Sequence, residues 1–277
     1  MDVNDAIKMG VRAFEITSVM LASAKRQKEV GILDTLAIEL ATLADTHARQ
    51  VADLPDEPKL ARHDCKKGCS YCCHLSVALT VPELYSLWLN IPAPLRKGVG
   101  ELAKDRKRMG EVERCRQKMP CMLLDTLMGM SEYEPARLRQ GPSWQANCTI
   151  YKHRPLACRA MYAVSADRCQ LAFGKAHANI VRPMHPIVRP MHPTLGIQGV
   201  GVGAMGAIAE MGCNPHVVAM DHALALLASV PSPELVFQEW LLGHEQILTK
   251  ARLKSAPAPK ALAKVCESMR ATCESIK

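Results

Sequence analysis

Four cysteines stand close together in the first third of the chain: Cys65, Cys69, Cys72 and Cys73. The whole chain holds only 12 cysteines in 277 residues, so composition alone does not explain the cluster. In a helix, these spacings would place all four sulfurs on one face; in a loop, Gly68 would allow the turn with which a Cys-x2-Cys pair binds one ion. Both conformations indicate a metal site. A Cys72–Cys73 disulfide is the alternative, disfavoured because it is strained and needs an oxidising compartment.

A second group of cysteines follows downstream, as Cys121, Cys148, Cys158 and Cys169. Arg154 should be extended because it precedes Pro155, and Pro155 suits the first position of a helix. Cys158 would then lie in the first turn of that helix, where the helix dipole favours a thiolate over a thiol. Three neighbouring arginines suit the negative charge of a four-thiolate site: Arg154, Arg159 and Arg168.

These motifs resemble the YkgJ-type cysteine-cluster family of zinc- or iron-chelating domains. The resembling segments are Cys-x3-Cys-x2-Cys-Cys from Cys65, Pro-Cys-x-x-Leu-Asp from Pro120, and Cys-Thr-Ile-Tyr-x-x-Arg-Pro-x-x-Cys-Arg from Cys148, with a later cysteine. The resemblance covers residues 62–170, and a long insertion from Thr126 to Asn147 departs from it. It implies eight metal ligands: Cys65, Cys69, Cys72, Cys73, Cys121, Cys148, Cys158 and Cys169.

Eight thiolates can form two four-coordinate sites, and either zinc or one or two 4Fe–4S clusters would satisfy them. The spacing Cys65-x3-Cys69-x-Tyr71-Cys72 also resembles radical S-adenosylmethionine enzymes, although their barrel needs alternating strands and helices. Flagellin lysine methylases carry a similar cluster. Two functions follow from the cysteines: a metal-binding protein with a protein or peptide partner, or an iron–sulfur, S-adenosylmethionine-dependent enzyme that modifies a protein or peptide. Whether the chain is an enzyme stays open, and no catalytic residue is assigned.

Nucleic-acid binding is a third and weaker interpretation. The chain has 35 lysines and arginines against 27 aspartates and glutamates, a formal net charge of +8. Residues 103–118 form a basic segment with the residue pattern of a helix. However, two occupied four-thiolate sites would lower the net charge to about +4. Aromatic residues, which stack on bases, make up only 4% of the chain. The basic segment is therefore interpreted as a solvated helix face of mixed charge.

The expected fold class is mainly α, with helical flanks around an irregular, strand-poor, cysteine-rich metal-binding domain. A helical hairpin over 1–54 should turn near Gly31, because apolar residues recur at helical spacing on both sides. The cysteine-cluster domain occupies 62–170, and Thr80-x-x-Glu83 is a capping box that begins a helix there. A Pro/Gly-rich connection follows over 171–215, and the C-terminal helices occupy 216–277.

Two segments of the connection match motifs that we interpret structurally. Gly201 to Gly206, with Asp221 further on, matches a dinucleotide-binding pattern, but no strand is expected before it, so we favour a glycine-rich connection or close helix packing. The repeat Val-Arg-Pro-Met-His-Pro over 181–194 could bind a soft metal, but a duplicated surface loop is the favoured interpretation.

The expected compartment is the cytoplasm, where thiols stay reduced. The first thirty residues carry acidic side chains and lack an export signal, and residues 190–209 hold too many prolines and glycines for a membrane span, so no membrane partner is expected. Four cysteines remain outside the ligand set and are interpreted as packing residues: Cys115, Cys213, Cys266 and Cys273.

Overall fold

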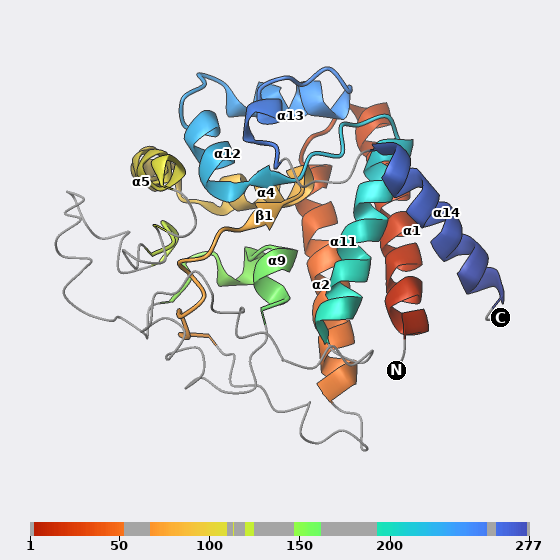
Figure 1. Cartoon of the computed structure of the whole chain (residues 1–277). Coiled ribbons are helices and arrows are strands. Elements are labelled where there is room, and N and C mark those ends of the chain that lie inside the picture. The colour runs from red at the N-terminus through yellow and green to blue at the C-terminus, as the bar shows by residue number, and fades with distance from the viewer. Residues whose placement is uncertain are drawn as a thin grey trace.

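The computed structural model describes residues 3–52, 67–109, 113, 120–124, 147–161, 193–253 and 259–275. Within these ranges the protein is mainly helical, with one two-stranded sheet (Figure 1), which confirms the coarse fold class. Several features of the sequence analysis lie outside the described residues: Cys65, Cys115, Cys169, Arg168, the insertion up to residue 146 and the repeat up to residue 192.

The helical hairpin at the start of the chain is confirmed. Helix α1 (Val3–Gln27) is followed by α2 (Ile32–Ala52). The turn spans residues 28–31, near Gly31 as predicted, and Lys28 adopts the left-handed conformation with φ of 55°. The amide of Glu29 donates to the carbonyl of Ala24 over 3.1 Å, which is the hydrogen bond typical of a helix that ends on a left-handed residue.

Helix α11 (Pro193–Glu210) packs along α1 and also contacts α2 (Figure 1). A Cβ atom on Gly199 would lie 2.3 Å from the carbonyl oxygen of Ala6, and one on Gly203 would lie 1.9 Å from that of Gly10. The expected connection over 171–215 is therefore helical from residue 193, because its glycines allow two backbones to approach. Of the two interpretations of Gly201 to Gly206, close helix packing is the right one.

The C-terminal helix α14 (Pro259–Ser275) lies on the outer side of α1 and α11 (Figure 1). Leu262 and Cys266 are buried on its inner face, whereas Val265 is 44% exposed. Cys266 and Cys213 are both buried among apolar side chains, which confirms them as packing residues.

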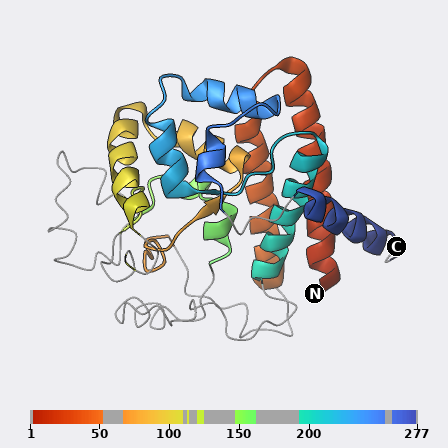
Figure 2. The ribbon, with the colours of Figure 1, turned by 45° about the horizontal axis from the view of Figure 1, so that its top comes forward.

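The remaining helices form the other half of the molecule. Helix α4 (Val81–Asn90) packs on α2, and α5 (Arg96–Arg108) lies beside α12 (Met220–Leu227) in Figure 2. Along the chain, η1 (Ala93–Leu95) connects α4 to α5, and α13 (Pro233–Leu241) and η3 (Leu248–Ala251) follow α12. Strand β1 (Ala78–Leu79) pairs antiparallel with β2 (Val218–Ala219), Ala78 opposite Ala219. This pairing joins the segment after the first cysteine cluster to the C-terminal part of the chain.

The basic segment, of which the structure describes 103–109 and residue 113, carries exposed charges of both signs as interpreted, with Arg106 as a buried exception. Helix α5 begins earlier than predicted and ends at Arg108, since Met109 is extended. Arg106 is only 1% exposed and pairs with Asp221 of α12. Two exposed pairs within α5 join Lys104 to Glu101 and Arg108 to Asp105. Of the basic side chains that the structure describes here, Arg106 is therefore paired in the interior, whereas Lys104 and Arg108 are paired on the surface.

None of the described helices, α11 included, combines the length and the apolar character that crossing a membrane requires.

His47 gives this fold a predictable pH dependence. The side chain is 3% exposed on α2, and burial lowers its pKa while the charge of Asp5 opposes the shift. The unfolded chain then binds more protons, so the free energy of unfolding should fall as the pH drops below the ordinary value of 6.5. Urea unfolding at about pH 7.5 and about pH 5.5 measures this loss. His47→Gln should reduce the difference between the two pH values, and an unchanged difference would contradict the assignment.

Candidate metal centre

From residue 67 on, the first cysteine cluster lies in a loop rather than a helix. Residues 67–77 form turns that lead into β1, with the amide of Cys73 donating to Ser70 over 2.9 Å and that of Leu75 to Cys72 over 3.0 Å. Gly68 has φ of 92°, a conformation that glycine adopts without strain. The loop alternative of the sequence analysis, with Gly68 at the turn, is therefore the right one.

The segments of Cys121 and Cys148 are paired with each other. Leu124 and Cys148 form an isolated antiparallel bridge. The carbonyl of Leu123 accepts both the amide and the hydroxyl of Thr149, each over 2.9 Å. Nη1 of the buried Arg106 donates to the carbonyl of Pro120 over 2.5 Å, which fixes the residue before Cys121 to helix α5.

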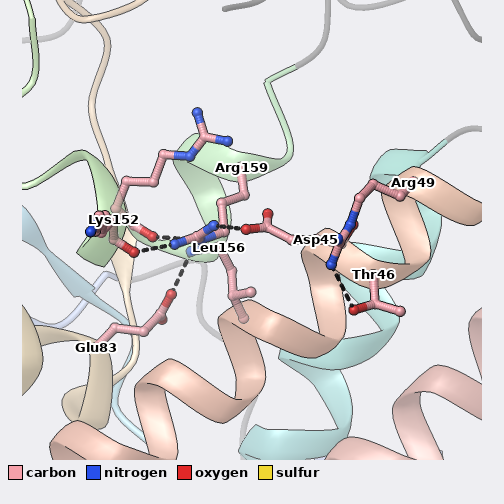
Figure 3. A network of polar contacts seen from close by, with 8 residues as sticks. Asp45, Thr46, Arg49, Glu83, Lys152, Leu156 and Arg159 are labelled. Atoms are coloured by element: carbon pink, nitrogen blue, oxygen red, sulfur yellow. Dashed lines mark hydrogen bonds and ion pairs between the residues drawn. The ribbon is translucent and has the colours of Figure 1, made fainter. Parts of the chain in front are cut away.

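Cys158 lies on the short helix α9 (Leu156–Arg159), which follows η2 (Tyr151–His153). Arg154 is extended, as predicted, but the helix begins at Leu156 with Pro155 as its N-cap. The carboxylate of Glu83 joins α9 to α4 (Figure 3). Its Oε1 accepts the amide of Leu156 over 2.6 Å, while Oε2 accepts the amide and hydroxyl of Thr80 over 2.8 and 2.7 Å. The predicted capping box therefore also holds the Cys158 segment.

Arg159 gives the same segment a second attachment. Its Nη1 pairs with Asp45 of α2, as Figure 3 shows. Its Nε donates to the carbonyl of Arg154 over 2.9 Å, and its Nη2 to that of Lys152 over 2.6 Å. The guanidinium thus holds the backbone between η2 and α9. Arg159 was expected to balance thiolate charge; in the structure its donors are committed to Asp45 and to two carbonyls.

Five of the eight expected ligands come together where these segments meet: Cys72, Cys73, Cys121, Cys148 and Cys158. Each is close enough to others of the group for their charges to interact. The thiols of Cys72 and Cys73 share a hydrogen bond, which lowers the pKa of Cys72 and raises that of Cys73. Three stretches of chain, 67–77, 120–124 and 147–161, thus supply thiols to one region.

Burial decides the protonation of the other thiols. It raises the pKa of Cys121 to about 12, against the opposing charge of Arg106. It also raises the pKa of Cys158 well above its ordinary value, and the charges of Cys72, Cys121 and Cys148 add to the shift. The expectation that a helix dipole favours the Cys158 thiolate is therefore wrong, because α9 has only four residues and burial dominates.

Cysteine thiolates are ligands that zinc ions and iron–sulfur clusters take in proteins. A metal ion that binds these sulfurs displaces their protons. Its positive charge then offsets the negative charge of the thiolates, which burial alone would disfavour. All eight cysteines whose side chains the structure describes are free thiols, the Cys72–Cys73 pair included. Within the described residues, no three His, Cys, Asp or Glu side chains are arranged to hold an ion. Cys69 is partly buried in the same loop, whereas Cys65 and Cys169 lie outside the described residues.

Three residues that hold this region in place escaped the sequence analysis as site residues. Glu83 was assigned only to a capping box, Asp221 was noted only with the glycine pattern, and Asp45 carried no signal at all. Each acts on a segment far away in the sequence, through Leu156, Arg106 and Arg159 respectively.

No family model, curated protein or solved structure matches this chain. The likeness to the YkgJ-type family therefore depends on the cysteine motifs alone.

Proposed function

We propose that this chain is a metal-binding protein that holds zinc or an iron–sulfur cluster through cysteine thiolates. The convergence of Cys72, Cys73, Cys121, Cys148 and Cys158 from three stretches of chain is the observation that carries the proposal. Packing alone accounts for single buried cysteines such as Cys213 and Cys266, which lie among apolar side chains of the core. It gives no reason for five thiols in one region.

The attachments of the three stretches support a structural role for the metal. Each stretch has its own link to the helical core: β1 to β2, Arg106 to Pro120, and Glu83 with Arg159 to the α9 segment. A metal ion bound between them would cross-link the stretches to one another. Metal binding would then contribute directly to the stability of this half of the protein.

The two remaining interpretations receive less support. The described part of the chain has only two-residue strands, unlike the strand and helix alternation of radical S-adenosylmethionine enzymes. Nucleic-acid binding loses Arg106 as a contact, since this residue is buried and ion-paired. A protein or peptide is the partner that we retain from the sequence analysis.

Anaerobic purification, followed by elemental analysis and visible absorption, tests the proposal. We expect about two zinc ions per chain in a colourless protein, or iron and sulfide with broad absorption near about 400 nm. Iron and sulfide would lead to an assay of S-adenosylmethionine cleavage, which separates an enzyme from a binding protein. A folded chain with neither metal would contradict the proposal.

A further inference from the structure

Arg154 differs from the other arginines of the region in how its backbone and side chain are held. Its φ and ψ are −61° and 138°, and its carbonyl accepts the Nε of Arg159 over 2.9 Å. Its guanidinium carbon lies 4.3 Å from the centre of the Tyr151 ring, a cation–π contact that orients the side chain. Both ends of the residue are therefore fixed.

The donors of Arg154 are not used in the same way as those of its neighbours. Arg106 pairs with Asp221 and Arg159 with Asp45. In the described part of the chain, Arg154 forms no ion pair, and its buried Nε has no hydrogen-bond partner. An unsatisfied buried N–H is unfavourable and calls for an acceptor. The guanidinium is also close enough to Cys72 and Cys158 for its charge to act on both.

We propose that Arg154 is a positioning residue of the occupied metal site, where its Nε–H donates to a cysteine sulfur and its charge balances that of the thiolates. This inference rests on the proposed function. A divalent ion bound by four thiolates has a net charge of −2, which favours a nearby cation that no carboxylate has already neutralised. An arginine side chain is suited to this role because its guanidinium is always charged, is weakly hydrated, and presents its N–H donors in a fixed planar geometry. Residues that hydrogen-bond to the ligands of a metal site orient those ligands and tune the affinity for the metal.

Zinc affinity provides the test. Metal-free protein, prepared as the wild type and as Arg154→Gln and Arg154→Lys, is titrated with zinc against a competing chelator. Arg154→Gln should bind zinc about 10-fold to 100-fold more weakly. Arg154→Lys should recover part of this loss, because it keeps the charge and loses the fork of donors. Lys152→Gln removes the same charge from an exposed neighbouring side chain and should change the affinity by less than about twofold.

The outcomes separate this inference from the proposed function. If the wild type binds no zinc, and carries no iron as purified, both are overturned. If the wild type binds zinc and Arg154→Gln binds it equally tightly, the inference about Arg154 alone is wrong. Equal losses in the glutamine and lysine variants would also overturn it, since a purely structural role would not distinguish a charged replacement from a neutral one. Far-UV circular dichroism of each variant establishes that the helices are intact.

Discussion

Asp221→Ala is expected to lower the free energy of unfolding by about 3–5 kcal/mol, because it leaves a buried arginine without its counter-ion. The side chains of Arg106 and Asp221 are 2% and 5% exposed, and Nε lies 3.1 Å from Oδ1. Arg106 also holds the carbonyl of Pro120, so the loss should extend to the Cys121 segment. Urea unfolding, followed by far-UV circular dichroism, measures the change.

Two variants control for this result. Asp105→Ala removes a carboxylate from an exposed pair with Arg108, 3.7 Å away, and should change stability by less than about 0.5 kcal/mol. The double variant Arg106→Met with Asp221→Ala should be more stable than Asp221→Ala, because no uncompensated charge remains buried. If Asp221→Ala and Asp105→Ala have equal effects, the buried ion pair does not have the role described.

Gly203→Ala should destabilise the protein by about 1–3 kcal/mol, since overpacking at a rigid contact forces the backbone to move. The added Cβ would lie 1.9 Å from the carbonyl oxygen of Gly10, which belongs to the backbone of α1 and cannot rotate away. Helices α1 and α11 would have to separate, and both lie in the apolar core. Thermal or urea unfolding of the variant measures the loss.

Gly201→Ala is the matched control within the same helix. A Cβ on Gly201 would meet nothing within 4 Å. Alanine favours helix over glycine by about 0.8–1.0 kcal/mol, so this variant should be as stable as the wild type or more stable. Similar losses at Gly201 and Gly203 would show that the glycines serve something other than the α1–α11 contact.

Local signals in the sequence predicted the flanking helices well. Apolar spacing identified α1 and α2, and the Thr80 capping box marked the start of α4. Helix α11 is different, because its glycines oppose helix formation in isolation. Its stability comes from packing on α1, a tertiary contact that composition does not reveal. The same glycines therefore suggested a connection in the sequence and form a helix in the structure.

The candidate site was predictable in its ligand types but not in its supports. Motif resemblance grouped Cys72, Cys121 and Cys158, and the structure brings these three into one region. The partners of Glu83 and Arg159 lie 73 and 114 residues away, and no periodic pattern connects such positions. The spacing of Arg154 and Arg159 could not separate their roles either. In the described part of the chain, Arg159 has a carboxylate partner, Asp45, and Arg154 has none, and this difference arises only in the folded structure.

Metal content per chain in three proteins tests the central claim most directly. The wild type, Cys158→Ser and Cys213→Ser are purified anaerobically and analysed for zinc and iron. Cys158 belongs to the converging thiols, whereas Cys213 is a buried cysteine of the core. The wild type and Cys213→Ser should carry the same amount of metal, and Cys158→Ser should lose at least about half of it. Equal metal content in all three proteins, or none in the wild type, would contradict the assignment of these cysteines as ligands.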